Sequence, residues 1–127
     1  MERIEIEATK STPFVILDEI ENKLHIKGQS YPENSVDFYD PIVEWIEEYI
    51  ENLGSKEAVL ELNMLYLNTS SSKCMMDLIY IFDEAYENGK NVKIQWICHP
   101  TNEAMIDFGE EYGEDLSVPF EIVEVTE

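Results

Sequence analysis

Apolar residues recur along the chain at two spacings, and these spacings predict strands that alternate with helices. Residues 58–67 form a mostly apolar stretch without Gly or Pro, which has the length of a buried strand. Apolar residues at helical spacing precede this stretch and end before Gly54. A second set at the same spacing follows the stretch and ends before Gly89. The predicted core stripes of these helices are Tyr39, Ile42, Val43, Ile46, Tyr49, Ile50 and Leu53 in the first, and Met75, Leu78, Ile79, Phe82, Ala85 and Tyr86 in the second.

Shorter patterns predict the other elements. Ile alternates with charged residues near the N-terminus, as in an edge strand, and two short apolar runs flank a polar segment, as in a β-hairpin. The predicted order is a strand over residues 3–7, a hairpin over 13–17 and 23–27, a loop over 28–34, a helix capped by Ser35, the strand over 58–67, a helix over 70–88, a strand over 92–97 that places Trp96 in the core, a helix from Thr101 or Asn102, and a strand over 120–125. For Trp45, the sequence is compatible with a place in the core and with a place in an interface.

This order predicts one α/β domain over residues 1–127, with a mixed β-sheet packed against about three helices. The strand–helix–strand unit over residues 58–97 implies a right-handed crossover and parallel strands, whereas the hairpin adds an antiparallel pair. No repeat or linker marks a second domain. With a hydroxyl-bearing loop between strand and helix, this order is similar to the STAS fold of anti-sigma-factor antagonists, in which such a Ser or Thr is the regulated phosphosite.

Acidic residues dominate the charge of the chain. Its 28 Asp and Glu against 8 Lys and Arg give a formal net charge of −20. Nucleic acids and anionic membranes are bound through Lys and Arg, so this excess argues against both as partners. We interpret most of the acidity as a source of solubility, with steering toward basic partners as the alternative. The N-terminus lacks the basic and apolar regions of a signal peptide, and we therefore expect a cytoplasmic protein.

Candidate catalytic and metal-binding residues are scarce. His25 and His99 have neither a His nor a Cys partner at metal-ligand spacing, and the sequence contains no Gly-rich phosphate-binding loop. Cys74 and Cys98 form no CxxC pair and are expected to be reduced thiols. We therefore predict a non-enzymatic protein that uses no metal, cofactor or small-molecule substrate. The rival from another class is a small acidic enzyme built on the acidic residues of segment 110–115.

The most distinctive segment joins the central strand to the second helix and reads Tyr66-Leu67-Asn68-Thr69-Ser70-Ser71-Ser72-Lys73. One hydroxyl is needed to cap the helix, because its first backbone N–H groups lack intrahelical partners, but a cap uses one residue and not four. The segment is therefore either a cap within a polar loop or a phosphorylation site. A phosphate here would meet the positive end of the helix dipole and free N–H donors.

Four motifs give the chain a resemblance to the SiaC family of bacterial regulatory phosphoproteins. They occur in the family's order, and the first two are specific in combination. The segment Ile97-Cys98-His99-Pro100 departs from the pattern, because relatives usually carry aromatic residues there; the phosphosite motif is unaffected, but the identity of the partner is less well specified. The motifs are YLNTSSSK at residues 66–73, QSYPENS at 29–35, NVKIQW at 91–96 and EDLSVPF at 114–120.

The resemblance implies a phosphorylation switch centred on Thr69. In the family this threonine is phosphorylated by a dedicated kinase and restored by a PP2C-type phosphatase. The unmodified form is expected to bind and activate a diguanylate cyclase (a GGDEF protein), which raises cyclic di-GMP and favours biofilm or aggregation, and phosphorylation is expected to block binding. The residues expected to shape the phosphosite loop are Asn68, Ser70, Ser71 and Ser72, with Lys73 screening the added charge.

The partner surface is expected beside this loop. It is predicted to comprise Tyr31, Pro32, Glu33, Asn34 and Ser35. The alternative for the aromatic residues of this region, Tyr31 and Phe38, is a hydrophobic staple that holds the loop onto the first helix.

A second interpretation of the switch stays open at this point. An anti-sigma-factor antagonist in a partner-switching pathway would use the same phosphosite to control binding of an anti-sigma kinase. The neighbouring genes distinguish the two, because a GGDEF-domain cyclase favours the first and a sigma factor the second.

Overall fold

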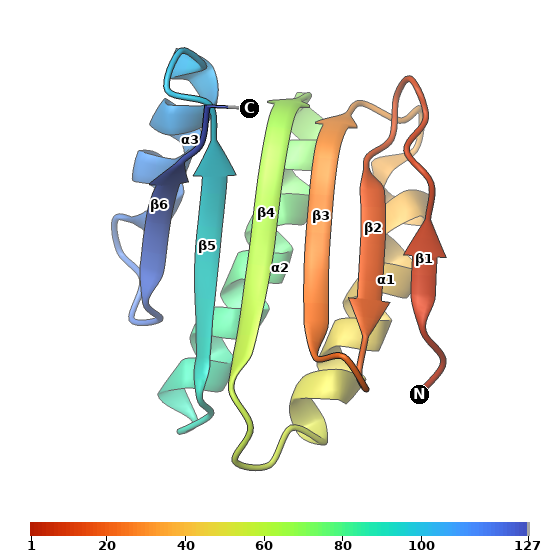
Figure 1. Ribbon diagram of the computed structural model, residues 1–127, viewed down its shortest axis with the longest axis vertical. Coiled ribbons are helices and arrows are strands. Elements are labelled where there is room, and N and C mark those ends of the chain that lie inside the picture. Colours follow the sequence, from red (N-terminus) through yellow and green to blue (C-terminus); the bar gives the residue numbers. More distant parts are fainter. Residues whose placement is uncertain (127) are drawn as a thin grey trace.

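The six strands of the sheet lie side by side in the order in which they occur in the chain (Figure 1). The computed structural model describes residues 1–126 and confirms the predicted mixed α/β fold. The elements are β1 (Ile4–Ile6), β2 (Phe14–Asp18), β3 (Lys23–Ser30), α1 (Ser35–Glu51), β4 (Ala58–Leu67), α2 (Thr69–Glu87), β5 (Val92–Cys98), α3 (Glu103–Gly113) and β6 (Phe120–Glu124).

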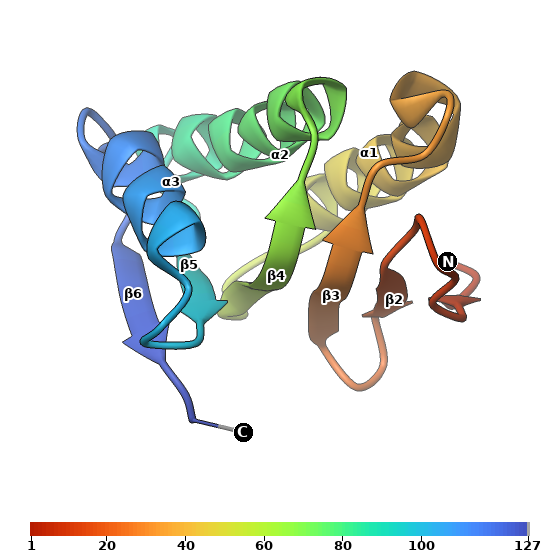
Figure 2. The ribbon, with the colours of Figure 1, turned by 90° about the horizontal axis from the view of Figure 1, so that it is seen from above.

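The three helices connect parallel strands and cover one face of the sheet. β3, β4, β5 and β6 pair in parallel, whereas β1 with β2 and β2 with β3 pair antiparallel. Every parallel step moves in the same direction across the sheet, and right-handed crossovers then place each connecting helix on the same face. Figure 2 shows this result, with α1, α2 and α3 all on one side of the strands.

The core lies between the sheet and the helices. Buried and less buried side chains alternate along β5, as expected for a strand with one covered face. Trp96 is fully buried, as predicted, and its indole Nε1 donates to the carbonyl of Met105 in α3 at 2.7 Å. The ring therefore fills the core while its polar N–H group keeps a partner.

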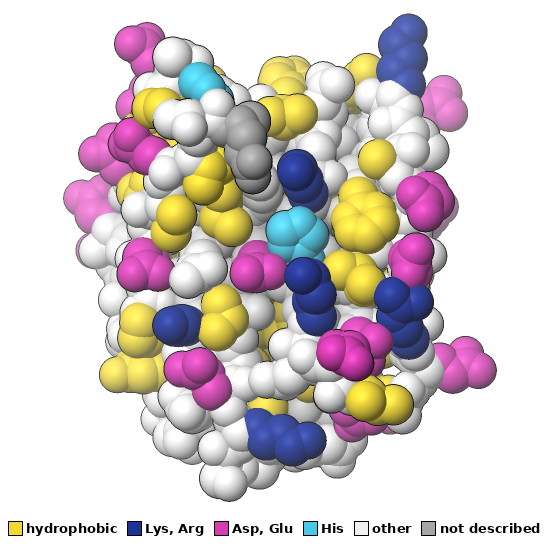
Figure 3. All heavy atoms as spheres, in the orientation of Figure 1, with side chains coloured by type: hydrophobic (Ala, Val, Ile, Leu, Met, Phe, Trp, Pro, Cys, Tyr) yellow, Lys and Arg dark blue, Asp and Glu magenta, His cyan; other side chains and the backbone are white. Residues whose placement is uncertain are grey.

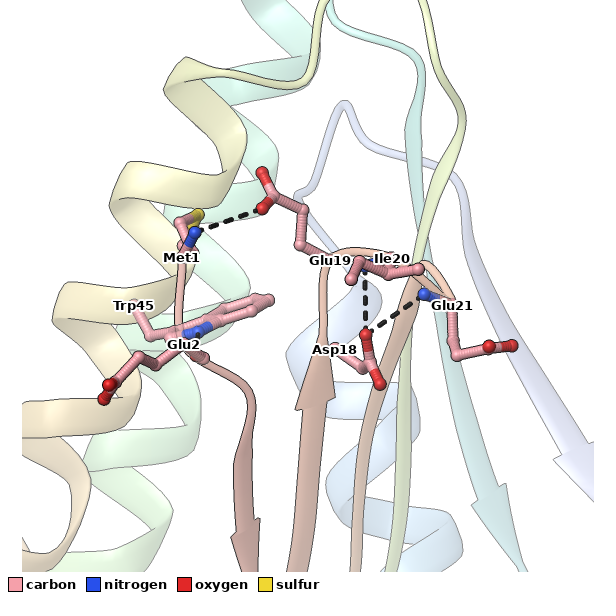
Figure 4. A network of polar contacts seen from close by, with 7 residues as sticks. All are labelled: Met1, Glu2, Asp18, Glu19, Ile20, Glu21 and Trp45. Carbon is pink, nitrogen blue, oxygen red and sulfur yellow. Dashed lines mark hydrogen bonds and ion pairs between the residues drawn. The ribbon is translucent and has the colours of Figure 1, made fainter.

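Trp45 of α1 holds the N-terminal edge strand in place. Its side chain is buried, and its Nε1 donates to the carbonyl of Glu2 at 2.7 Å, next to β1 (Figure 4). Nearby, the amino group of Met1 lies 3.3 Å from Glu19, and Asp18 accepts two backbone N–H groups of the β2–β3 turn. Trp45 thus belongs to the core and also ties the edge of the sheet to the helical layer.

The opposite face of the sheet carries cations among apolar side chains (Figure 3). Lys23 and Lys27 are exposed on β3, with His25 half-buried between them. The Nδ1 atom of His25 lies 3.1 Å from Oε1 of Glu61 on β4. Burial lowers the pKa of His25, and Glu61 opposes this effect. Because burial is the larger influence, the neutral form of His25 is favoured here.

Several predicted boundaries differ from the structure. The predicted loop over residues 28–34 is shorter, because β3 continues to Ser30 and keeps its pairing with β4 through a register shift after Gly28. Gly28 has a φ of 129°, a conformation that side-chain-bearing residues rarely adopt. The second helix begins at Thr69, one residue earlier than predicted. Tyr86, placed in the core stripe by its spacing, is 41% exposed because it lies at the margin of that stripe.

Gly109 of α3 lies against the ring of Trp96. A Cβ atom at this position would come within 2.4 Å of Trp96 Cδ1 and 2.8 Å of Nε1. Replacing Gly by Ala in a helix normally gains about 1 kcal/mol, but overpacking a core costs about 1–3 kcal/mol. We expect Gly109→Ala to lower the midpoint of urea unfolding, followed by tryptophan fluorescence, whereas Glu110→Ala at the next, exposed position should not. An unchanged midpoint for Gly109→Ala would mean that α3 can move away from Trp96 at little cost.

Candidate functional site

The two loops predicted to form the site lie side by side at the carboxyl ends of the central strands β3 and β4. Because β3 and β4 are parallel, with Ser30 paired with Leu67, their carboxyl ends lead into α1 and α2 at the same edge. The N–H of Asn68 donates to the carbonyl of Ser30 at 3.1 Å and joins the two strand ends directly. The segment of residues 31–35 therefore lies next to the segment of residues 68–73.

An asparagine caps each of these helices. The Oδ1 atom of Asn68 accepts the N–H of Ser71 at 2.9 Å, and Oδ1 of Asn34 accepts the N–H of Asp37 at 3.1 Å. The predicted caps, Ser35 for α1 and a loop hydroxyl for α2, are therefore wrong. In both cases the preceding asparagine has the extended backbone that a cap requires. The hydroxyls that follow each cap are consequently available for other contacts.

Five hydroxyl groups form a network beneath the site. Ser30 Oγ, at the end of β3, lies 2.7 Å from the hydroxyl of Tyr39 and 2.8 Å from Ser71 Oγ. Ser35 Oγ lies 2.8 Å from Ser70 Oγ and 3.2 Å from Ser71 Oγ. Ser30 and Ser71 are fully buried, and Ser35 is 3% exposed. Burial raises the pKa of Tyr39, so its hydroxyl stays neutral and the network joins β3, α1 and α2 without any charge.

Ser72 extends this arrangement to the third helix. Its hydroxyl is hydrogen-bonded to that of Tyr112 in α3. The Tyr112 ring in turn meets Trp96 edge-on, with ring centroids 5.4 Å apart. Burial raises the pKa of Tyr112, and the bond to Ser72 opposes this effect. The start of α2 is therefore attached through its serine hydroxyls to β3, α1 and α3.

Thr69 differs from the serines that follow it. Its side chain is exposed, and within residues 1–126 its hydroxyl has no hydrogen-bond partner. It occupies the first position of α2, where the backbone N–H groups lack intrahelical acceptors. Lys73 is exposed four residues later, hence on the same side of the helix. An anionic group on Thr69 would meet both the positive end of the helix dipole and this ammonium group.

The loop before α1 is only partly exposed. Tyr31 and Pro32 are half-buried, whereas Glu33 and Asn34 are exposed. Ser35 is nearly inaccessible, and its hydroxyl points to serines of α2 and not to solvent. Ser35 therefore lies beneath the predicted partner surface and supports it from within.

Exposed apolar side chains near the end of β4 and at the start of α1 were not predicted from the sequence. Leu65 and Tyr66, near the end of β4, are 54% and 48% exposed, and Val36 in the first turn of α1 is 59% exposed. Tyr66 meets Tyr31 edge-on, with ring centroids 5.9 Å apart. The available signal was the consecutive apolar pair at a strand end, because side chains alternate between the faces of a strand. We call Tyr31, Val36, Leu65, Tyr66 and Thr69 the Thr69 surface.

The remaining candidate groups bond locally or are buried in the core. His99 bonds to the hydroxyl of Thr101 at 2.7 Å, and Cys74 and Cys98 are buried free thiols whose pKa values are raised by burial. In the part of the chain that the structure describes, no three His, Cys, Asp or Glu side chains are placed to hold a metal ion. Across residues 1–126, no helix is both long and apolar enough to cross a membrane.

One family model matches the chain along nearly its whole length, that of the SiaC family regulatory phosphoprotein, over residues 6–125. The chain belongs to the SiaC family. An uncharacterized protein of Pseudomonas aeruginosa (strain UCBPP-PA14) is 38% identical to it over 122 residues, which is 96% of either chain. The crystal structure of apo-SiaC from Pseudomonas aeruginosa has a TM-score of 0.87 and 36% identity, covering 97% of this chain and 99% of SiaC.

A second SiaC structure includes a partner. In the crystal structure of the diguanylate cyclase SiaD in complex with its activator SiaC, from Pseudomonas aeruginosa, one chain matches this one with a TM-score of 0.90 and 37% identity. The match covers 96% of this chain and 99% of that chain. The predicted resemblance to the SiaC family is therefore confirmed, and the agreement in backbone extends over the whole domain.

The SiaC-like motifs divide between the site and the core. The segments 66–73 and 29–35 form the adjoining β4–α2 and β3–α1 connections. The segment 91–96 contributes buried β5 residues, including Trp96, and the segment 114–120 contains the buried Val118. Only the first two motifs therefore border the exposed Thr69 surface of this SiaC-family chain.

Proposed function

We propose that this chain is a non-enzymatic regulator whose unphosphorylated form binds and activates a diguanylate cyclase. The observation that carries the proposal is the full-length similarity to a chain in the complex of the cyclase SiaD with its activator SiaC, at a TM-score of 0.90 and 37% identity. The family's description as a regulatory phosphoprotein supports the same role. This similarity also favours a cyclase over an anti-sigma kinase as the partner.

Thr69 is the phosphate acceptor in this proposal. Its exposed hydroxyl is unbonded within residues 1–126, whereas the hydroxyls of Ser70, Ser71 and Ser72 are bonded to other elements. Phosphorylation of Thr69 would add about −1.5 to −2 charges at pH 7 without breaking any of those contacts. The helix N-terminus and Lys73 would stabilise the added charge in place. The modified protein would keep its fold and present a different surface.

The cyclase docks on the Thr69 surface in this proposal. The exposed apolar side chains there supply area to bury, and aromatic residues such as Tyr66 are common anchors of interfaces. Residues 31–34 extend the contact along the neighbouring loop, while Ser35 acts from beneath. A phosphate placed among these side chains would lose water on docking, whereas Lys73 and the helix N-terminus would stabilise it equally before docking and would not offset this loss, so binding is disfavoured.

A kinase and a phosphatase would set the fraction of active regulator. We infer from the family resemblance a cognate protein kinase that modifies Thr69 and a PP2C-type phosphatase that restores it. The chain would then switch partners in the cytoplasm between its kinase and the cyclase. Cyclic di-GMP, and with it biofilm formation, would rise with the unphosphorylated fraction.

Cyclase activity measured on purified proteins tests the proposed function. The GGDEF cyclase encoded nearest to this chain converts GTP to cyclic di-GMP, and the unmodified chain should raise that rate and co-elute with the enzyme. Tyr66→Ala should weaken the apparent affinity about tenfold, as expected for an aromatic anchor. Tyr86→Ala is the matched control, because Tyr86 is similarly exposed but lies at the other end of α2. A cyclase rate that does not respond to the chain would contradict the proposal.

A further inference from the structure

The three serines that follow Thr69 each bond to a different neighbour. Ser70 Oγ lies 2.8 Å from Ser35 Oγ in α1, and Ser71 Oγ lies 2.8 Å from Ser30 Oγ in β3. The Ser72 hydroxyl bonds to α3 through the hydroxyl of Tyr112. Four similar hydroxyls in a row would offer a kinase four acceptors, but in the fold they are not equivalent.

Phosphoryl transfer requires a hydroxyl that can leave its own hydrogen bonds. The acceptor oxygen forms a bond to the γ-phosphorus of ATP, the bond from that phosphorus to the β–γ bridging oxygen breaks, ADP leaves, and the hydroxyl proton passes to a base of the kinase. Thr69 meets this requirement, because it is exposed and unbonded within residues 1–126. Ser71 does not meet it, because its side chain is fully buried.

Ser70 is the intermediate case. Its side chain is exposed, so packing does not keep a kinase from it. Its hydroxyl is bonded to Ser35 Oγ at 2.8 Å and lies 3.3 Å from Oδ1 of Asn68. Ser35 is itself held in place by burial and by a second bond to Ser71 at 3.2 Å. A fixed partner of this kind must be given up before Ser70 can react.

We propose that Ser35 is a specificity-determining residue, which confines phosphorylation to Thr69 by holding the Ser70 hydroxyl against α1. This inference rests on the proposed function, in which Thr69 is the acceptor. Ser35 does not touch the reacting atoms and is a positioning residue. Loss of its hydroxyl frees Ser70, whereas loss of the Ser30 hydroxyl leaves Ser71 buried and unreactive.

The test uses a background in which Thr69 cannot react. A kinase enriched from the source cells by its activity on the wild-type chain is supplied with ATP, and phosphate is located by intact-mass and fragment analysis. The wild-type chain should carry one phosphate on Thr69. Thr69→Ala should incorporate little, and Thr69→Ala/Ser35→Ala should gain phosphate on Ser70 at least about fivefold faster, the factor expected from one hydrogen bond. Thr69→Ala/Ser30→Ala should behave like Thr69→Ala alone.

The possible failures are distinguishable. A wild-type chain that carries its phosphate elsewhere than Thr69, or none, would contradict the proposed function. Phosphate on Thr69 of the wild type with no gain at Ser70 in the Ser35 variant would overturn the role of Ser35 alone. Thermal unfolding verifies that each variant is folded, and Ser35→Gly removes the same hydroxyl if Ser35→Ala does not fold.

A measurement without any kinase examines the same contact. Amide hydrogen exchange at Ser71 and Ser72, whose N–H groups bond to Asn68, should be several-fold faster in Ser35→Ala than in the wild type, because α2 loses an attachment to α1. The exposed Ser55, in the loop between α1 and β4, provides the control Ser55→Ala, which should leave these amides unchanged. Unchanged exchange in Ser35→Ala would count against the inference.

Discussion

Phosphorylation of Thr69 should weaken cyclase binding at least tenfold and leave the fold intact. The phosphate adds about −1.5 to −2 charges at pH 7 to the Thr69 surface of a chain whose net charge is already −20. Tenfold corresponds to about 1.4 kcal/mol, which is small beside the cost of desolvating a doubly charged group whose contacts with Lys73 and the helix N-terminus would form before binding as well. Titration calorimetry of the two forms measures the affinities, and their circular dichroism spectra should superimpose.

Matched variants separate charge from position in this result. Thr69→Ala should bind like the unmodified chain, and Thr69→Glu should bind more weakly, though less so than the phosphorylated form, because it adds a single charge. Ser55→Glu adds the same single charge in the exposed loop that precedes β4, at the opposite edge of the sheet, and should bind normally. Equal affinities of the phosphorylated and unmodified chains would exclude Thr69 as the control point. Loss of binding in Thr69→Ala would instead mean that the hydroxyl is a contact.

Most elements of this fold were predictable because they have one buried face. The alternation along β5 and the helical stripe of α2 come from a single rule, that apolar side chains turn toward one core, and both are confirmed by burial. Once the strand–helix–strand units were identified, right-handed crossovers implied parallel strands, as the sheet shows. Local periodicity was therefore sufficient to predict the sheet and the helices that cover it.

The contacts at the site were not predictable in the same way. Asn34 and Ser35 are adjacent, and both residue types are good helix caps. The backbone makes Asn34 the cap and turns Ser35 inward. Which hydroxyls of residues 69–72 are buried depends on how α2 packs against α1, β3 and α3, and periodicity within α2 does not contain that information.

The partner surface is a second feature that local sequence patterns did not predict. Leu65 and Tyr66 are apolar and lie within a strand, and local pattern alone placed them in a buried stretch. Their exposure follows from an extra residue in β4: the pairing with β3 passes from Gly28–Met64 to Gln29–Tyr66 and skips Leu65, so both side chains are exposed between the buried Met64 and Leu67. The cyclase itself was inferred through the family motifs, because no feature of the net charge or the site geometry specifies a GGDEF protein.

Ser71→Glu should be the most destabilising single change at the site, lowering the free energy of unfolding by at least about 3 kcal/mol. Ser71 is fully buried, and its hydroxyl bonds to Ser30 at 2.8 Å and Ser35 at 3.2 Å. A carboxylate there would be enclosed by uncharged hydroxyls with no cation to pair with, so α2 must detach at its start or the group must take up a proton. Urea unfolding at pH 7 measures the loss.

Thr69→Glu is the matched control for Ser71→Glu, because it adds the same charge two residues earlier in the same helix. Thr69 is exposed at the first position of α2, where a negative charge gains about 0.3–1 kcal/mol from the helix dipole. Its unfolding midpoint should therefore equal or slightly exceed that of the wild type, while Ser71→Ala, which loses hydrogen bonds without adding charge, should cost about 1–3 kcal/mol. If Ser71→Glu unfolds at the same urea concentration as Thr69→Glu, the hydroxyl network does not enclose Ser71, and the difference between Thr69 and its neighbouring serines must come from the kinase and not from this fold.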